Sequence, residues 1–299
     1  MRSRFAFVLL TAASLAGCGV GEIGDEEEIG EDQEEVIANN GMSLNGMSLN
    51  GMSLNGMSLN GMSLNGASLS GMTVNGSGLQ GTRNGVAVTG AGLVGTTLTG
   101  VLSTGASLPI RIDSAQLLAV PNNDVWAYGV SYQSGSSWLP LCGSGVQALA
   151  LKGTWNYGSN VTNGGAWTSS TTSFTFACRG AAIAKCVELG YKPWKTVGGT
   201  LLQNHHLSCV RAIRADYCGN GRSYTANGLQ INIYDNKGVQ ADAAAWPIDA
   251  EWTPTGARCI HSARSWNAGQ GTPTCWLAKL HITCGSFSNG ALIVDEYKQ

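Results

Sequence analysis

The sequence predicts an α+β protein in which a β-solenoid precedes a disulfide-rich, strand-dominated domain containing a helical hairpin. Three observations support this prediction. Glycine recurs every five residues from Gly41 to Gly81. Eight of the nine cysteines lie between Cys142 and Cys284. Between those cysteines, alternating strand-like runs are interrupted by two segments with helical spacing. The chain is therefore divided into four parts: residues 1–17, 18–39, 40–108 and 109–299.

The first 17 residues have the composition of an export signal. Arg2 and Arg4 precede an apolar run over residues 5–10, far shorter than the ~20 residues of a spanning helix. The following Leu15-Ala16-Gly17-Cys18 resembles the bacterial lipobox, which implies cleavage before Cys18 and lipid attachment to it. The alternative is an ordinary secretory signal with an unrelated cysteine. We expect a lipid-anchored protein of the bacterial envelope, at the outer membrane or cell surface, that contacts the membrane through this lipid.

Residues 18–39 form an acidic tether. Residues 22–35 hold nine acidic residues and no basic residue, and like charges keep such a segment extended. Residues 36–299 hold 15 Lys and Arg against 10 Asp and Glu, a net charge of +5. This charge is too dilute for a nucleic-acid surface, so we expect no nucleic-acid partner.

Residues 40–108 form the glycine-pentad region. An apolar residue stands three places after most of these glycines, as at Leu44, Leu79 and Leu98. A period of five does not fit a helix, and in a flat strand it would turn successive leucines to opposite faces. Asn-Gly favours a turn. A coil that turns a corner once per unit fits both facts and buries a column of leucines.

This array resembles pentapeptide-repeat proteins, whose square β-helix places four units in each coil. The resemblance is incomplete, because that family prefers a small residue two places before the central leucine. Ala67, Ser77 and Ala91 satisfy this preference, but methionine occupies the position in six units. The alternative is a low-complexity spacer in the exact-repeat half, with order beginning near Ala67.

Residues 109–299 contain all nine tryptophans and eight cysteines. Strands are predicted from residue 110 and over residues 125–132, 146–151 and 173–176. An even cysteine count in an exported protein predicts disulfides, and the sequence has no Cys-x-x-Cys pair of a zinc ribbon. We therefore expect no metal and no cofactor. The predicted disulfide cysteines are Cys142, Cys178, Cys186, Cys209, Cys218, Cys259, Cys275 and Cys284.

Two helices are predicted, over residues 182–189 and over about 201–217. Cys178 and Cys186 mark the first, and Cys209 and Cys218 mark the second. The two separations correspond to about 12 and 13.5 Å along a helix. Antiparallel helices could then be joined at both ends, by Cys178–Cys218 and Cys186–Cys209. The other four cysteines would share two bridges among themselves.

Residues 109–299 also contain five distinctive motifs. The central one is Ala215-Asp216-Tyr217-Cys218. The others are Phe176-Ala177-Cys178-Arg179-Gly180-Ala181, Leu189-Gly190-Tyr191-Lys192-Pro193-Trp194, Ile233-Tyr234-Asp235, and Glu251-Trp252 with Gly256-Ala257-Arg258-Cys259. Together these motifs resemble the ADYC-domain proteins, an uncharacterised family of exported bacterial proteins, over roughly residues 108–284. The resemblance implies no activity, substrate or catalytic residue.

The acidic and histidine residues admit two interpretations. Asp216 lies near a predicted helix C-terminus, where the helix dipole disfavours an anion, so we expect an ion pair with Arg211, Arg214 or Arg222. The alternative makes Asp216 a catalytic acid beside His205 or His206, but these residues are about 15 Å apart along one helix. His206 fits a hydrogen-bonded core residue. Residues 235–238 fit a turn better than a calcium loop.

The tryptophans suggest a binding surface. Trp138, Trp167, Trp194 and Trp266 stand in polar or Gly/Ser/Pro-rich surroundings and are candidates for exposed stacking platforms. We expect a lipoprotein of the bacterial cell envelope, a non-enzymatic binding or structural module displayed on a repeat spacer, with a glycan or protein as partner. The alternative is a secreted-type hydrolase that uses Asp216, His206 or Asp235.

Overall fold

The computed structural model describes residues 37–39, 57–59, 69–102, 107–171, 173–280, 283–287 and 290–299. The predicted signal, Cys18 and most of the exact pentads lie outside these residues. Within them, strands dominate and helices are few, which agrees with the predicted strand-dominated domain.

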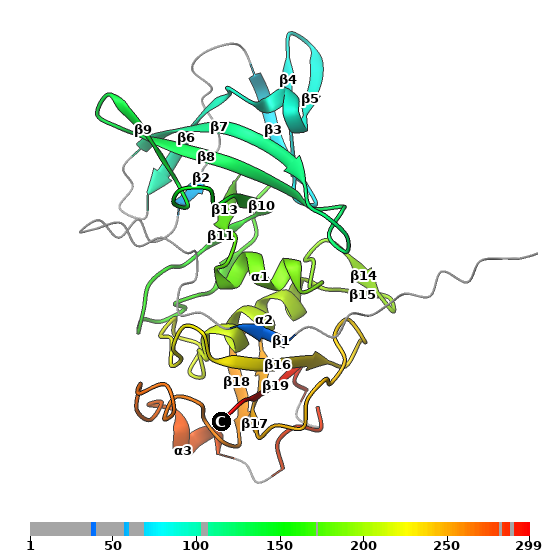
Figure 1. The fold of residues 1–299 in the computed structure, drawn as a ribbon, viewed down its shortest axis with the longest axis vertical. Coiled ribbons are helices and arrows are strands. Elements are labelled where there is room, and N and C mark those ends of the chain that lie inside the picture. The colour runs from blue at the N-terminus through cyan, green and yellow to red at the C-terminus, as the bar shows by residue number, and fades with distance from the viewer. Residues whose placement is uncertain are drawn as a thin grey trace, which may run out of the picture. The chain divides into compact units, whose positions relative to one another are not determined.

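The largest sheet closes on itself (Figure 1). Strand β8 pairs with β7 and β9 and also with β10, so the antiparallel pairing runs around a ring of six strands, from which β9 extends as a hairpin. In ring order the strands are β10 (Ala148–Lys152), β13 (Phe174–Cys178), β2 (Met57–Leu59), β6 (Thr97–Leu102), β7 (Ser107–Leu117) and β8 (Trp126–Ser134), with β9 at Ser137–Pro140. The ring is a small β-barrel.

The described pentads do not form a solenoid. Residues 69–102 fold as β3 (Leu69–Asn75), β4 (Gly78–Arg83), β5 (Val86–Thr89), the 3-10 helix η1 (Gly90–Leu93) and β6. Strands β3, β4 and β5 pair antiparallel, and the stacked coils predicted for these residues are wrong. The Asn-Gly turn is confirmed at Asn84 and Gly85, which both have positive φ between β4 and β5.

The pentad leucines are buried against the barrel instead of against one another. Leu79, Leu93 and Leu98 are at most 1% exposed and share a core with Ile110 and Tyr128. This core crosses residue 108, where the sequence suggested a boundary. The pentad leucines are therefore buried against the apolar interior of the barrel, and stacked coils are not needed to remove them from water.

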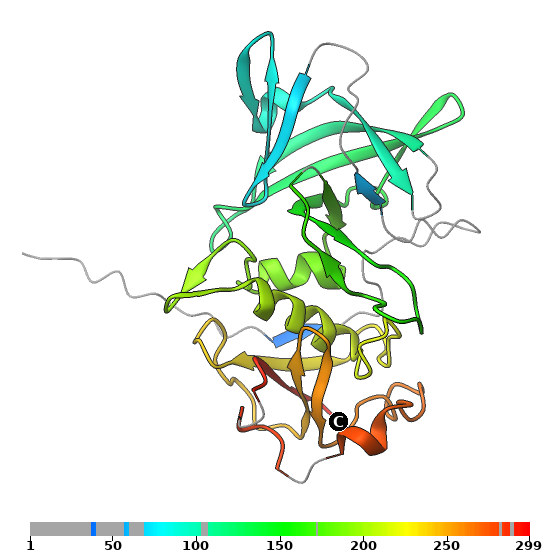
Figure 2. The same cartoon turned by 180° about the vertical axis from the view of Figure 1, so that it is seen from behind.

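The second sheet has five antiparallel strands in the order β1, β16, β19, β17, β18. These are β1 (Ile37–Asn39), β16 (Gln230–Asp235), β19 (Ile293–Tyr297), β17 (Ile248–Thr253) and β18 (Gly256–Ile260). Helix α2 (Gln203–Arg214) packs on β17, β18 and β19, and helix α1 (Ala182–Glu188) contacts α2 and β13 (Figure 2). The predicted helical pair thus fills the layer between the two sheets.

Short elements complete the fold. Two two-stranded hairpins and one short helix remain: β11 (Thr154–Trp155) with β12 (Trp167–Thr168), β14 (Thr196–Val197) with β15 (Thr200–Leu201), and α3 (Trp276–Lys279). None of the helices among the described residues is long and apolar enough to cross a bilayer.

All eight predicted cysteines form disulfides, but only part of the predicted connectivity is right. Cys186–Cys209 joins α1 to α2, as predicted. Cys178 lies on strand β13 and pairs with Cys142, so Cys178–Cys218 is wrong. The other bridges are Cys218–Cys275 and Cys259–Cys284. Four disulfides indicate an extracytoplasmic location.

Candidate functional site: the turn after helix α2 and its adjoining pocket

Helix α2 ends at a residue in the left-handed conformation. Ala215 has φ 49°, and its N–H bonds back to the carbonyl of Ala212. Such a residue is usually glycine, because a side chain costs energy at positive φ. The alanine is fully buried, and the residues on either side of it are held by side-chain bonds. The turn Ala215–Cys218 is therefore fixed by its surroundings and not by local preference.

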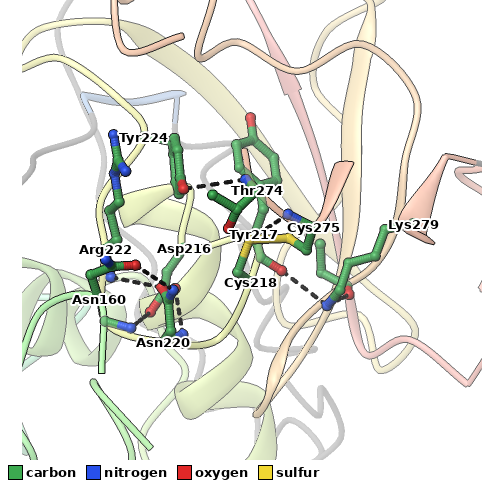
Figure 3. Close-up of a disulfide and its surroundings, with 12 residues drawn as sticks. Asn160, Asp216, Tyr217, Cys218, Asn220, Arg222, Tyr224, Thr274, Cys275 and Lys279 are labelled. Atoms are coloured by element: carbon green, nitrogen blue, oxygen red, sulfur yellow. Dashed lines mark hydrogen bonds between the residues drawn. A yellow bond between two sulfur atoms is a disulfide. The ribbon is translucent and has the colours of Figure 1, made fainter. Parts of the chain in front are cut away.

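The carboxylate of Asp216 organises this turn (Figure 3). It accepts hydrogen bonds from Arg211 Nη1, from Asn220 N at 3.1 Å and from Gly221 N at 2.9 Å, and Arg214 Nη1 lies 3.6 Å away. Asp216 is fully buried. The predicted ion pair with Arg211 and Arg214 is confirmed, and a carboxylate surrounded in this way has no position open for a substrate.

Arg211 and Arg214 also connect this turn to neighbouring loops by hydrogen bonds. Arg211 donates to the carbonyls of Gly164 (2.7 Å) and Pro254 (3.1 Å), and Arg214 donates to the carbonyl of Gly221 (2.6 Å). Burial lowers the pKa of Arg214, and the charge of Asp216 opposes that shift. One carboxylate thereby connects helix α2, two loops and the β17–β18 hairpin.

Tyr217 belongs to a second, fully buried network. Its hydroxyl donates to Asp249 Oδ1 at 2.6 Å, and its ring stacks on Trp252 at 5.2 Å between centroids. Burial, and next the charge of Asp249, raise the pKa of Tyr217 well above its usual value. Tyr217 therefore stays protonated and serves as a hydrogen-bond donor in the core.

Arg264 is the centre of this network. Its guanidinium donates to both Asp249 and Asp295, to the last carbonyls of α2 at Ala212 and Ile213, and to Thr225 Oγ1 at 3.2 Å. Arg264, Asp249 and Asp295 are all fully buried. Burial raises the pKa of Asp249 and Asp295, and the charge of Asp249 adds to the shift at Asp295. Arg264 thus caps a helix and neutralises carboxylates at the same point.

A pocket of about 580 Å³ adjoins the turn. The β17–β18 hairpin forms one side and α3 another, and Lys279 bridges them by donating to the carbonyls of Tyr217 (3.0 Å) and Ala257 (2.6 Å) (Figure 3). Burial lowers the pKa of Lys279. The lining residues are Thr253, Thr255, Ala257, Arg258, Ala278, Lys279 and Gly290. This set has two basic side chains, two hydroxyls and no carboxylate, so it suits a negatively charged or hydroxyl-rich ligand.

A family model described as the ADYC domain matches residues 90–266. The chain belongs to the ADYC domain family. Its four signature residues are now assigned physical roles: a left-handed helix end at Ala215, a buried ion pair at Asp216, a core hydrogen bond at Tyr217 and a disulfide at Cys218. Searches of curated proteins and of solved structures find no match.

His205 and His206 of the ADYC domain have separate partners. His206 Nε2 lies 3.0 Å from the carbonyl of Ile183 and is fully buried, as predicted for a core residue. Burial lowers its pKa to about 4. His205 Nε2 lies 3.1 Å from Asn236 Oδ1, and Asp235 accepts from Tyr191 OH and from the backbone N–H groups of a turn. The structure therefore gives each of these groups its own bonds and does not join them to Asp216.

The four candidate tryptophans of the ADYC domain differ in exposure. Trp266 is 47% exposed and contacts Trp276 edge to face at 4.8 Å. Trp138 lies under Arg111, Trp167 donates to the carbonyl of Lys152, and Trp194 packs against the helix–sheet core. These three are half-buried.

One cluster among the described residues has metal-ligand residue types. Glu251, Cys259 and Cys284 place ligand atoms within 4.8 Å of one another. The two sulfurs are joined in a disulfide, so they offer no thiolate. Glu251 Oε1 instead accepts three backbone N–H bonds, each of 2.8 Å, from Gly285, Ser286 and Phe287. The cluster holds a loop.

Sequence reasoning missed Arg258, Arg264 and Lys279. Arg258 lies within a motif quoted for the family, but its neighbours gave no sign of a pocket. Arg264 lies 15 residues from Asp249, 31 from Asp295 and 52 from Ala212. No local pattern marks such a residue, because every partner is brought to it by the fold.

Proposed function

We propose that this chain is an exported lipoprotein of the bacterial envelope whose ADYC domain is a non-catalytic binding module for a surface glycan or protein. The lipobox-like residues 15–18 and the acidic tether support anchoring through Cys18. The four disulfides support maturation in an oxidising compartment.

The pocket beside the Ala215–Cys218 turn carries this proposal. Its walls belong to elements fixed by the buried ion pairs and by the Cys218–Cys275 bridge, so the site is preorganised. Arg258 and Lys279 supply positive charge, and Thr253 and Thr255 supply hydroxyls. Acidic saccharides offer the complementary carboxylates and hydroxyls.

The hydrolase alternative has less support. It requires an acid, a base and a substrate position within hydrogen-bond reach of one another. His206 and Asp216 are fully buried in separate networks, and Asp235 holds its own turn. No observation among the described residues favours that chemistry.

Binding to an acidic polysaccharide tests the proposal. The purified, oxidised chain is titrated with polygalacturonate, with neutral dextran as the comparison, by isothermal calorimetry. We expect binding to polygalacturonate alone, weakened about threefold to fivefold by Arg258→Gln. Lys298→Gln removes the same charge at an exposed position outside the pocket and should leave the affinity unchanged.

Two results would overturn the proposal. One is equal weakening by Arg258→Gln and Lys298→Gln, because it would show binding by net charge and not by the pocket. The other is hydrolysis of a glycan or ester substrate by the chain, with no stable binding of that ligand. Intact mass of material from the native host tests the anchor, since a diacylglyceryl group on Cys18 adds a defined mass.

A further inference from the structure

Helix α3 displays apolar side chains to solvent instead of burying them. None of its four residues is buried, and Leu277 is 87% exposed. Leu280, directly after the helix, is 48% exposed, and Trp266 is 47% exposed and contacts Trp276 edge to face at 4.8 Å between ring centroids. We call Trp266, Trp276, Leu277 and Leu280 the α3 face. Exposed apolar side chains gathered in this way mark contact sites for proteins or membranes.

The α3 face is fixed in this exposed position. Cys275, immediately before the helix, is joined to Cys218 by a disulfide. At the other end, Lys279 donates to two backbone carbonyls (Figure 3), and Leu280 forms a parallel β-bridge with Ile260 of β18. The helix would have to break these contacts to turn its apolar side chains inward, so the face is preorganised for a partner.

The chain around the α3 face carries positive charge and no negative charge. Residues 252–294 contain no Asp or Glu. Their basic residues include Arg258, which is exposed, and Lys279, which lines the pocket beside α3. The acids that bracket this stretch, Glu251 and Asp295, are fully buried. A negatively charged surface can therefore approach the face without meeting an exposed carboxylate from the stretch or its two brackets.

A bilayer that contains anionic lipids fits both properties of this surface. Interfacial binding combines apolar side chains that enter the headgroup region with nearby positive charge. Tryptophan favours that boundary because its ring is apolar and its N–H is polar. The α3 face has only four side chains, far fewer than the roughly 20–30 residues per partner of a stable protein interface. The small size and the charge favour a membrane over a protein partner.

We propose that the α3 face docks on a membrane that contains anionic lipids. Leu277 and Leu280 enter the boundary between head groups and acyl chains, Trp266 lies at that boundary, and Arg258 faces the anionic head groups. The contact is weak and reversible by itself, because few apolar side chains and few charges are involved. A second attachment to the same membrane, such as the proposed lipid on Cys18, would make it intramolecular and strengthen it. Docking does not require that lipid.

Vesicle binding by the full-length, oxidised chain tests this inference. All samples carry Cys18→Ser, so that no lipid can be attached, and the probes are vesicles of phosphatidylcholine alone or mixed in equal parts with phosphatidylglycerol. Co-sedimentation measures binding, and quenching of tryptophan fluorescence by brominated acyl chains measures contact with the bilayer. The first tryptophan of the chain is Trp126, so quenching does not report contact by the N-terminal segment.

We expect binding and quenching with the anionic vesicles, and little of either with phosphatidylcholine alone. Leu277→Ser should weaken binding about tenfold, because this leucine no longer gains from leaving water. Its matched control is Leu201→Ser on β15, which removes a leucine that is 52% exposed and should leave binding unchanged. Arg258→Gln should weaken binding about fivefold, whereas Lys195→Gln, also at an exposed position, should leave it nearly unchanged.

Four results would overturn the inference. The first is absence of binding to the anionic vesicles, and the second is equal loss within either matched pair. The third is binding without quenching, which would place the contact outside the α3 face. The fourth is dimerisation without lipid that Leu277→Ser abolishes, because it would assign the face to a second copy of the chain.

The saccharide proposal can fail independently of this one. Leu277 does not line the pocket, so Leu277→Ser should leave the affinity for polygalacturonate unchanged while it weakens vesicle binding. The polygalacturonate titration contains no lipid.

Discussion

The two cores of this protein bury different kinds of polar side chain. The buried polar residues beside the barrel core, which is formed around Tyr128, Phe176 and the pentad leucines, include the uncharged Ser77 and Thr96. The helix–sheet core, around α2 and Trp252, encloses full charges, among them Asp216, Asp249, Arg264 and Asp295. The barrel is specified by backbone pairing, and the helix–sheet core by ion pairs between distant segments.

Strands β8 and β10 serve both cores and show how they are separated. Ala148 and Ala150 face the barrel core, and Leu149 and Leu151 face the helix–sheet core. Tyr128 and Ala127 divide in the same way. One strand can therefore line two different interiors, because successive side chains point to opposite faces of the sheet.

Arg264→Met is expected to give the largest effect. It leaves Asp249 and Asp295 buried without their cation and should lower the free energy of unfolding by about 3–5 kcal/mol. The matched change on the barrel is Arg111→Met, which breaks a pair with Asp113 in which both side chains are about one-third exposed. That change should cost less than about 1 kcal/mol. Guanidinium unfolding measures both, and equal losses would contradict the contrast between the cores.

The disulfides should not follow this contrast. Replacing Cys218 and Cys275 by alanine opens a bridge of sequence separation 57, and replacing Cys142 and Cys178 opens one of 36. Chain entropy predicts a loss of about 4 kcal/mol for either bridge, because the dependence on loop length is logarithmic. Guanidinium unfolding of the two double variants under non-reducing conditions measures both losses. A loss confined to one core would show that bridging, as well as charge, distinguishes the two.

A pH effect should come from the helix–sheet core, since every histidine of the chain lies beyond residue 200. The pKa of His206 is lowered to about 4, so the unfolded chain binds its proton near pH 6.5 and the folded chain only near pH 4. Neutral His206 therefore contributes its full share of the free energy of unfolding above pH 6.5. This contribution is lost as the pH falls toward 4, and the free energy of unfolding drops by about 2.5 kcal/mol between pH 7.5 and 4.5.

The difference between the unsubstituted chain and His206→Gln isolates this contribution from the carboxylates. His206→Gln should show a shallower loss of stability across that range in urea unfolding. Parallel pH profiles for the two chains would mean that His206 does not titrate between its folded and unfolded values.

Local pattern predicted many elements correctly. Alternation located strands β7, β8, β10 and β13, and helical spacing located α1 and α2 within a few residues. The even cysteine count predicted four disulfides. The Asp216 ion pair was also predictable, because Arg211 and Arg214 lie within five residues of it. Each of these depends on neighbours in the chain.

The predictions that failed concern long-range choices. Period and turn chemistry of the pentads are compatible with both a coil and a hairpin, and the barrel's apolar interior decides for hairpins in the described residues. Cys178 had several partners within reach in principle, and its place on β13 beside the loop of Cys142 selects one.

By itself, the sequence determined the period of the repeat, the strands and helices of the second half, the turn at Asn84-Gly85 and the ion pair of Asp216. The choice of strands that close the barrel, the pairing of the cysteines and the burial of Arg264 depend on the three-dimensional fold. Local propensities act through neighbouring residues, whereas Arg264 meets Asp249, Asp295 and Ala212 across 15, 31 and 52 residues. Such contacts stabilise the protein only after the intervening chain has folded, because folding must first bring the paired charges into contact and bury them.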